Sequence, residues 1–377
     1  MLYDIAIIGG GIHGAACADN LSQSGYRVVV LEQYSQAGLA TSSKSSKLIH
    51  GGLRYLESAQ FKLVRECLQQ RKYLLNRHPD LVKLVPFHIP IYQQSHRKSW
   101  LIRLGLSIYS LFSFKFFKTI NHSEWKKLDN LKTKDLKTVF QYYDGQTNDV
   151  LLTQRIMQQA QQNGTQLITD ACFISAECNN DLCKINYTKD NKIHDVDSKI
   201  IINATGPWIN HILKKITPSQ SQLDIDLVAG THILVNRKLT QGMYYLEAPQ
   251  DNRAVFVMPW KTPAGKNQTL IGTTETPFNG SPEKVVATEN EIEYLLQVHN
   301  HYFSTQLTRN DVIDSFSGLR VLPADNGSAF HRSRDTIIYY NNHIKNPKVF
   351  SIYGGKLTAH RVTAQQLSDI VTRHLNK

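Results

Sequence analysis

The first 32 residues carry the feature that most limits the folds open to this chain. A short apolar segment, Asp4–Ile8, is followed at once by the glycine-rich sequence GGGIHG at 9–14. A helical stretch (15–23), a Ser-Gly turn and a second apolar segment (26–31) then lead to Glu32. This order of strand, G-x-G-x-x-G turn, helix, strand and acidic residue is typical of a dinucleotide-binding βαβ unit.

The parts of this pattern suit the binding of a dinucleotide. Glycines let the backbone come close to a pyrophosphate at the helix N-terminus, where unpaired N–H groups and the helix dipole favour anions. A carboxylate at the end of the second strand accepts hydrogen bonds from the adenosine ribose. The residues that we expect to bind the cofactor here are Gly9, Gly11, Ile12, His13, Gly14 and Glu32.

The composition is that of a globular protein large enough for more than one domain. The chain has 377 residues, of which 41% are hydrophobic and 20% are charged. These values exclude a disordered, collagenous or disulfide-stapled protein. At about 100–200 residues per domain, we expect two or three domains.

Periodicity and turn residues predict the further elements. We expect helices over 64–76, 154–163, 289–300 and 358–375, strands over 172–177, 184–189 and 199–203, and extended chain between 223 and 276. Pro79, Pro86 and Pro90 predict irregular structure after the first of these helices. The alternation favours an α/β nucleotide domain that is interrupted by a β-rich second domain.

Cysteine usage argues against a metal centre. The five cysteines are an odd number, and their spacing is not that of metal ligands. Reduced thiols in a cytoplasmic protein fit this usage best. The apolar segment at 5–8 is too short for a signal peptide, so we expect a protein that is not secreted.

The positive charge is concentrated in one part of the chain. The net charge is +12, and ten Lys/Arg stand against three acidic residues between Arg97 and Lys137. Such a patch attracts an anionic partner, which is a nucleic acid, a membrane surface or an acidic substrate. The sequence contains no recognised nucleic-acid-binding module, so we do not expect nucleic acid as the partner.

An apolar segment within this basic region favours a lipid surface. The segment WLIRLGLSIYSLFSFKFF (100–117) is mostly apolar. On a helix, the preceding Ser99 falls on one narrow polar stripe with Arg103, Ser107 and Ser110. A membrane-spanning helix and a buried helix are both open alternatives. An interfacial helix, with its aromatic residues at the acyl boundary and its flanking lysines at anionic headgroups, fits best. We therefore expect a membrane-surface segment at 98–119.

Seven motifs in register resemble one enzyme family. Besides GGGIHG, they are ATSSKSSKLIHGGLRYL (40–56), NATGPW (203–208), GTH (230–232), GTTE (272–275), SGLRVLP (317–323) and YGGKLT (353–358). Together they closely resemble the FAD-dependent glycerol-3-phosphate dehydrogenases and glycerophosphate oxidases, from Asp4 to about Ser368. Two departures stand out: the family's usual C-terminal helical domain has no counterpart before Lys377, and Asn148–Leu151 replaces the family's Asp-Asp-Ala-Arg.

The resemblance implies an α/β fold with a D-amino-acid-oxidase-like architecture. A Rossmann-like FAD-binding domain would comprise 1–75, 145–222 and 315–377. A β-rich substrate domain with a mixed sheet would comprise 76–144 and 223–314.

The resemblance also assigns residues to FAD beyond the first βαβ unit. Cys172 would approach the adenine through its backbone, and the glycines at 354–355 would allow close approach to the isoalloxazine. The cofactor-binding residues so implied are Thr41, Ser42, Ser46, Lys47, Leu48, His50, Cys172, Ala204, Thr205, Gly206, Trp208, Gly354, Gly355, Lys356, Leu357 and Thr358.

A phosphorylated substrate needs cations, and the same motifs contain them. The resemblance places around the substrate Arg54, Tyr55, Arg320, Arg334 and Lys356. The guanidinium fork of arginine matches phosphate oxygens. Arg320 and Lys356 would also stabilise the alkoxide or anchor the phosphate.

Oxidation of an alcohol also needs a group that takes the hydroxyl proton, and histidine suits this role. His232, in the GTH motif, is the first candidate, and His50 is the second.

The implied reaction is the oxidation of sn-glycerol 3-phosphate to dihydroxyacetone phosphate. Hydride would pass from C2 to flavin N5, and electrons would continue to a membrane quinone. The alternatives are an oxidase that uses oxygen, a flavin enzyme for another hydroxy or amino acid, and a non-catalytic flavin-binding paralogue. The resemblance implies a cytoplasmic protein on the inner face of the cytoplasmic membrane, and a homodimer is left open.

Overall fold

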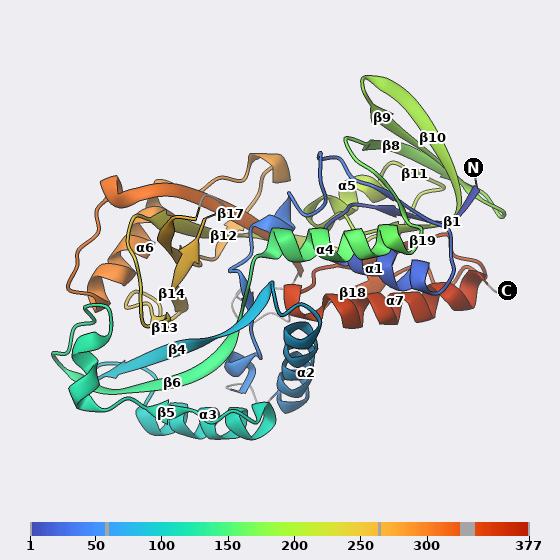
Figure 1. Ribbon diagram of the computed structural model, residues 1–377. Helices are drawn as coiled ribbons and strands as arrows, with labels where there is room; N and C mark the ends of the chain where they lie inside the picture. The colour runs from blue at the N-terminus through green and yellow to red at the C-terminus, as the bar shows by residue number, and fades with distance from the viewer. Residues whose placement is uncertain (1, 57–59, 263–264, 325–335, 376–377) are drawn as a thin grey trace.

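The computed structural model describes residues 2–56, 60–262, 265–324 and 336–375. Two mixed sheets, of nine and ten strands, form opposite halves of the molecule (Figure 1). Both termini lie in the half that contains the nine-stranded sheet.

Parallel strands form the centre of the nine-stranded sheet. β1 (Leu2–Ile8) lies between β2 (Val28–Leu31) and β10 (Lys192–Asn203), and β10 also pairs with β19 (Val349–Tyr353). The remaining strands are β7 (Gln166–Ile168), β8 (Cys172–Cys178), β9 (Cys183–Lys189), β11 (Ile216–Thr217) and β18 (Ile337–Tyr339).

Both faces of this sheet are covered, as a parallel sheet requires. Side chains alternate along β1, so that Ile5 and Ile7 pack under α1 (Ile12–Gln23), α4 (Asp149–Gln162) and α7 (His360–Leu375). Ala6 and Ile8 point to the other face, where the β8–β9 hairpin and α5 (Ile209–Leu213) pack. The first βαβ unit is therefore the predicted one, with its helix starting three residues earlier than the apolar pattern suggested.

The ten-stranded sheet forms the second half. Its order is β16-β12-β15-β14-β13-β4-β6-β3, with β17 beside β12 and β5 beside β6. The bounds are β3 (Leu48–Ile49), β4 (Val82–Tyr92), β5 (Lys118–Thr119), β6 (Leu136–Thr147), β12 (Ile225–Val235), β13 (Met243–Glu247), β14 (Ala254–Lys261), β15 (Asn267–Gly272), β16 (Thr276–Phe278) and β17 (Val312–Pro323). The predicted domain boundaries stay a prediction; β3 and the end of β17 pair within this sheet although the sequence assigned them to the cofactor domain.

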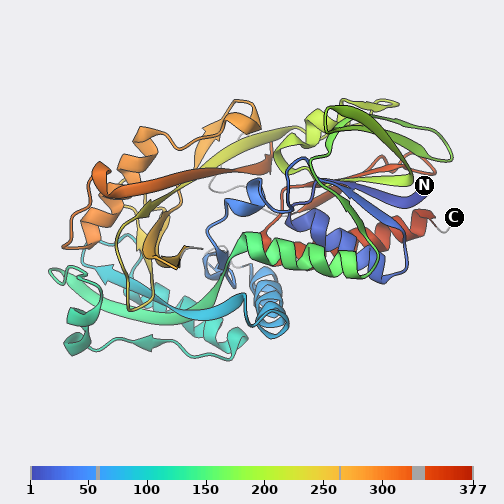
Figure 2. The same ribbon diagram turned by 45° about the horizontal axis from the view of Figure 1, so that its top comes forward.

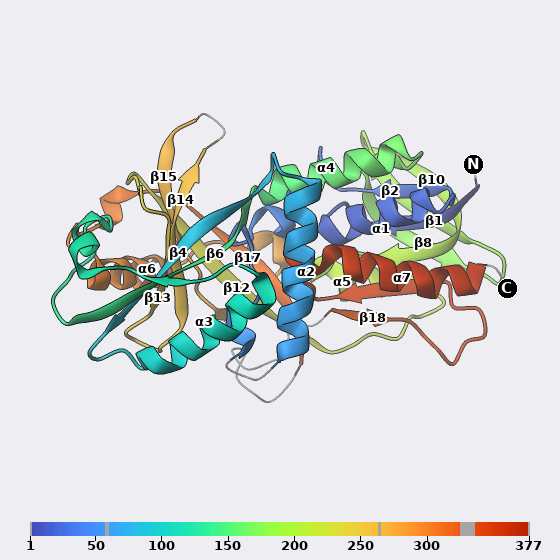
Figure 3. The ribbon, with the colours of Figure 1, turned by 60° about the horizontal axis from the view of Figure 1, so that its bottom comes forward.

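Helices cover both faces of this second sheet as well. Val139 of β6 belongs to a core with α6 (Glu289–Tyr302). The next residue, Phe140, belongs to a core with α2 (Phe61–Arg77) and α3 (Ser99–Ser113). Figure 3 shows α2 standing between the two halves, with α3 beside the ten-stranded sheet.

The prediction of irregular structure around Pro86 and Pro90 is wrong. Both prolines lie inside β4, which pairs with β6 along its length. They are four residues apart, so their missing N–H groups are on the same side of the strand. The other neighbour, β13, pairs with β4 only at Phe87 and His88, and this short pairing leaves room for residues without a donor.

The departure at Asn148–Leu151 is compatible with a normal helix start. The Asn148 side chain accepts a hydrogen bond from the Leu151 amide at 3.1 Å and caps α4. This cap explains why α4 begins at Asp149, five residues before the predicted start. Leu151, where the family has arginine, is exposed.

The segment predicted to meet a membrane forms a helix with two different faces. α3 ends at Ser113, before the predicted end, because Phe114 has a φ of 53°. Leu106 and Tyr109 are buried against the sheet, whereas Trp100 and Leu111 are 66% and 71% exposed. Within the described ranges, no helix is long and apolar enough to cross a membrane.

The expectation that all five thiols are reduced is wrong for one pair. Cys178 and Cys183 form a disulfide. They are paired residues next to the turn of the β8–β9 hairpin, with Cα atoms 4.0 Å apart. Cys17 and Cys67 are buried, and Cys172 is exposed. The described residues contain no group of three or more His, Cys, Asp or Glu that could hold a metal ion.

A buried carboxylate at the start of α4 holds the loop after β2. Asp149 is fully buried and accepts hydrogen bonds from the Ser45 amide and hydroxyl at 3.1 and 2.6 Å. It also pairs with the Lys47 ammonium at 2.7 Å. Burial lowers the pKa of Lys47, and Asp149 opposes that change.

We predict that Asp149→Ala lowers the free energy of unfolding by about 3–5 kcal/mol, because it leaves a buried ammonium without its partner. Denaturant unfolding of the FAD-loaded protein measures this loss. Asn148→Ala is the matched control, since it removes only a helix cap and should cost about 1 kcal/mol. Equal losses in the two variants would contradict the role of the buried pair.

Candidate functional site

One large cavity runs between the two halves of the molecule. Its volume is about 1060 Å³, just above the range of about 300–1,000 Å³ for ligand pockets. Figure 2 shows the long strands β12 and β17 extending from the ten-stranded sheet toward this junction. Residues from both sheets line the cavity.

Parallel register brings four loops to one edge of the nine-stranded sheet. Ile8 is level with Leu31 on one side and with Asn203 on the other, and Asn203 is level with Ser351. The loops that follow these strands therefore start side by side. They contain, in chain order, Gly9, Glu32, Ala204 and Gly354, all of which line the cavity. This edge is where open α/β sheets bind their ligands.

The start of α1 forms the cradle expected for a pyrophosphate. Gly11 is the N-cap and offers no side-chain acceptor, and the Ile12 amide donates to the Ser42 hydroxyl at 2.9 Å. Gly14 does not line the cavity. A Cβ at Gly14 would lie 1.9 Å from the Gly9 carbonyl oxygen, so this glycine permits close packing of helix on strand.

Glu32 lies at the end of β2 with its carboxylate fixed. It accepts hydrogen bonds from the Gly10 amide at 2.7 Å and from the Tyr34 amide at 2.9 Å. Burial raises the pKa of this carboxyl, while the backbone donors oppose that change. Cys172 lines the same cavity, so the residues predicted for the adenosine lie together.

The serine-rich loop contributes most of the predicted residues to the cavity, together with two others. Thr41, Ser42, Ser46 and Leu48 line the cavity, as do Lys44 and Ser45, which the sequence analysis did not assign. Lys47 does not line it, because Asp149 and the Ser43 carbonyl hold its ammonium.

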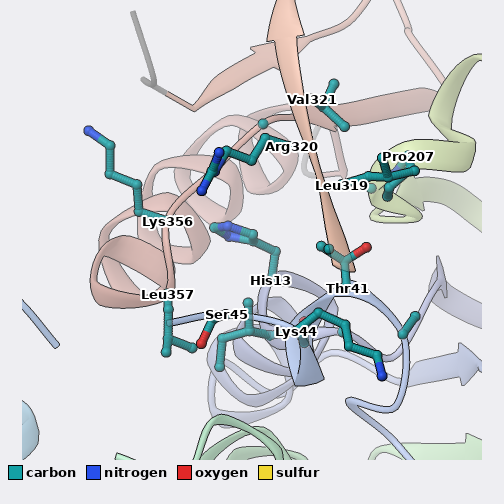
Figure 4. Close-up of a pocket in the computed structure, with 18 of the residues that line it drawn as sticks. His13, Thr41, Lys44, Ser45, Pro207, Leu319, Arg320, Val321, Lys356 and Leu357 are labelled. Carbon is teal, nitrogen blue, oxygen red and sulfur yellow. The ribbon is translucent and has the colours of Figure 1, made fainter. Parts of the chain in front are cut away.

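The loop before α7 meets His13 in the wall of the cavity. A Cβ at Gly355, where φ is 112°, would lie 2.0 Å from the His13 ring, so only glycine allows this approach. Neither ring nitrogen of His13 has a hydrogen-bond partner within the described part of the chain. Burial and the neighbouring His360 lower the pKa of His13 to about 3. In Figure 4 the His13 ring points toward the side of the cavity where Arg320 and Lys356 lie.

These features fit FAD. The helix start suits a pyrophosphate and the fixed carboxylate suits a ribose. Buried polar atoms without partners are atoms that a bound ligand commonly satisfies, and His13 presents two of them.

Charged side chains from the second sheet line the same cavity. Arg320 on β17 contacts Glu275 at 3.3 Å and the Thr273 hydroxyl at 3.4 Å. Arg253 pairs with the other oxygen of Glu275 at 2.6 Å. Arg253 and Glu275 are not among the residues predicted from the sequence. The GTTE motif was the available signal for Glu275, whereas Arg253 depends on strand pairing that no local pattern shows.

His232 is buried and neutral. Its Nε2 lies 3.0 Å from the Ser46 hydroxyl, and its ring stacks on Phe316. Burial, Lys47 and Arg320 lower its pKa to about 3. His50, the second candidate base, also lines the cavity.

The remaining predicted residues fall into two groups. Lys356 and Tyr55 line the cavity, with the ammonium 4.6 Å from the centre of the tyrosine ring. Also lining it are Thr205, Gly206, Trp208, Leu357 and Thr358. Arg334 and the side chain of Arg54 lie outside the described residues.

Known proteins share both the sequence and the fold. Residues 4–361 match the family model described as FAD dependent oxidoreductase. The chain is 34% identical over 369 residues to a glycerol-3-phosphate dehydrogenase of Pseudomonas tolaasii, covering 97% of this chain and 70% of the relative. It is 33% identical to a D-erythritol 1-phosphate dehydrogenase of Brucella abortus, covering 96% of this chain and 72% of the relative.

Among solved structures, the glycerol-3-phosphate dehydrogenase of Bacillus halodurans complexed with FAD has a TM-score of 0.77 at 24% identity. That match covers all of this chain and 65% of the solved chain. The sequence matches, the fold and the cavity at the sheet edge lead to one conclusion: this chain belongs to the FAD-dependent oxidoreductase family.

Proposed function

We propose that the chain oxidises sn-glycerol 3-phosphate to dihydroxyacetone phosphate with FAD as its cofactor. The observation that carries this proposal is that Arg320 and Lys356 line the same cavity as the FAD cradle. The relative from Pseudomonas tolaasii, named for this activity, supports it.

The cations suit the substrate's charge. A phosphate monoester carries about −1.5 to −2 charges at neutral pH, and guanidinium and ammonium groups bind such oxygens. We propose that Arg320 and Lys356 bind the phosphate and the reacting oxygen, with Tyr55 beside them. The sequence resemblance extends this proposal to Arg54 and Arg334 as further substrate-binding residues.

His232 is the proposed acceptor of the hydroxyl proton. Its neutral ring can take a proton, and the Ser46 hydroxyl fixes the ring's orientation. A dianionic substrate offsets the charges of Lys47 and Arg320, so its binding raises the pKa of His232. His50 stays the second candidate.

Bound FAD supplies the acceptor for the hydride that leaves C2 of the alcohol. The chain's own residues bind the phosphate, orient the alcohol and take its proton. The neutral His13 ring and the loop before α7 are the groups that we assign to the flavin end of the cavity.

We further propose that the protein acts on the inner face of the cytoplasmic membrane and passes electrons to a quinone. The exposed apolar side of α3 supports this, since Trp100 and Leu111 point away from the sheet. Lys98, Lys115 and Lys118 flank the helix in the sequence, and such cations suit anionic headgroups. Oxygen is the alternative acceptor, and the homodimer stays a prediction.

Anaerobic mixing of the FAD-loaded protein with sn-glycerol 3-phosphate tests the activity. We expect the absorption band of oxidised flavin to bleach within seconds, because the substrate's hydride reduces the cofactor. Added quinone or oxygen then identifies the acceptor. A band that persists with this substrate but bleaches with D-erythritol 1-phosphate or with an amino acid would assign another substrate. A band that no substrate bleaches favours the non-catalytic paralogue.

Arg320→Ala should lower kcat/KM for glycerol 3-phosphate by at least about a hundredfold, since a charge-assisted contact to the reacting groups is lost. FAD content should stay unchanged, because the cradle lies on the other sheet. The control is Arg309→Ala, which removes an exposed arginine paired with Glu289. Unchanged turnover in Arg320→Ala would remove this residue from the substrate site.

Replacing Trp100, Leu104 and Leu111 together by serine should abolish binding to vesicles that contain anionic lipid, as measured by co-sedimentation. The matched control replaces three exposed apolar residues outside α3, Ile193, Val286 and Ile313, by serine. Binding that survives in the α3 variant, or that is lost equally in the control, would contradict the proposed lipid contact.

A further inference from the structure

A buried carboxylate holds the backbone of the loop to which substrate binding is assigned. Asp144 on β6 is 1% exposed, and its two oxygens accept hydrogen bonds from the Gly51 amide at 2.9 and 3.1 Å. Gly51 follows His50 and precedes the short helix Leu53–Leu56, which contains Arg54 and Tyr55. No role described above uses this carboxylate.

Two other elements donate to the same carboxylate. Arg71 on α2 donates to it at 2.8 Å, and the Tyr109 hydroxyl on α3 donates to it at 3.0 Å. The Arg71 guanidinium also donates to the Tyr109 oxygen at 3.0 Å. Asp144, Arg71 and Tyr109 therefore form one hydrogen-bonded group, and all three side chains are buried.

The loop rests directly on this group. A Cβ at Gly51 would lie 2.1 Å from the Tyr109 hydroxyl oxygen and 2.3 Å from a methyl carbon of Leu68. The backbone at Gly51 thus fills the space that a side chain would need. A shift of Tyr109 toward the loop would therefore displace the Gly51 backbone.

Hydrogen bonds add a directional restraint to close packing. A buried carboxylate needs its donors within a narrow range of distances and angles. A buried amide that loses its acceptor costs about 1–3 kcal/mol, so the loop is held where Gly51 meets Asp144.

We propose that Asp144 and Tyr109 are positioning residues for substrate binding, which act by fixing the loop from His50 to Tyr55. This inference rests on the proposed function, since that function assigns the loop to the substrate. It gives α3 a second role: its inner face supports the substrate loop while its outer face is exposed.

Tyr109→Phe is the sharpest test, because it removes one hydroxyl and keeps the packing. The apparent Kd for glycerol 3-phosphate, from the concentration dependence of anaerobic flavin reduction, should rise about five- to tenfold for one lost hydrogen bond. The limiting reduction rate and the Kd for FAD should change less than twofold. A merely structural role would weaken FAD binding and thermal stability together and leave the substrate Kd unchanged.

Tyr92→Phe is the matched control. Tyr92 is also buried, its hydroxyl donates to the Lys132 carbonyl at 2.6 Å, and it does not line the cavity. The substrate Kd of Tyr92→Phe should equal that of the wild type. Asp144→Asn, tested as a second variant, should raise the substrate Kd further.

Hydrogen–deuterium exchange separates this inference from the proposed function. The amides of residues 48–56 should exchange faster in Tyr109→Phe than in Tyr92→Phe, whatever the substrate is. If the wild type is not reduced by glycerol 3-phosphate but this exchange difference appears, the proposed function fails and the positioning of the loop stands. If the wild type is reduced and Tyr109→Phe matches it in both substrate Kd and exchange, the inference is overturned.

Discussion

The parallel pairing of β1 with β2 and β10 is the constraint on which the site depends. This pairing aligns Ile8 with Leu31 and Asn203, so the loops after the strands begin at one edge. The glycines after β1 and the carboxylate after β2 then face a shared cavity without any need for a long loop. The elements packed on both faces exclude water from the strands, and this protects the hydrogen bonds that set the register.

The second sheet contributes charged and titratable side chains to the cavity. β12 and β17 bring His232 and Arg320 to the cavity from positions 88 residues apart in the chain. Burial and nearby cations keep His232 neutral. Its neutral state is therefore a property of the folded cavity and not of the GTH motif that contains it.

The nucleotide half could be predicted closely because its signals are local. Strand, glycine turn, helix and acidic residue occur within 32 residues, and each acts through its own backbone or its nearest neighbours. β4 was missed for the opposite reason, since Pro86 and Pro90 are tolerated only because of the strands beside them. Lys44 and Lys47 are both lysines in the same serine-rich loop, so the sequence does not distinguish them. Lys44 lines the cavity and Lys47 does not, because Lys47 pairs with Asp149, about a hundred residues away.

The sequence by itself determined the class of cofactor and the first βαβ unit. The physical reason is that glycines and a single carboxylate select a dinucleotide through contacts made within one short segment. Only the tertiary structure decided which charged groups share the cavity, which histidines stay neutral and what supports the loop at Gly51. Those properties depend on burial and on contacts between distant segments, as when Asp144, Arg71 and Tyr109 meet beneath one amide.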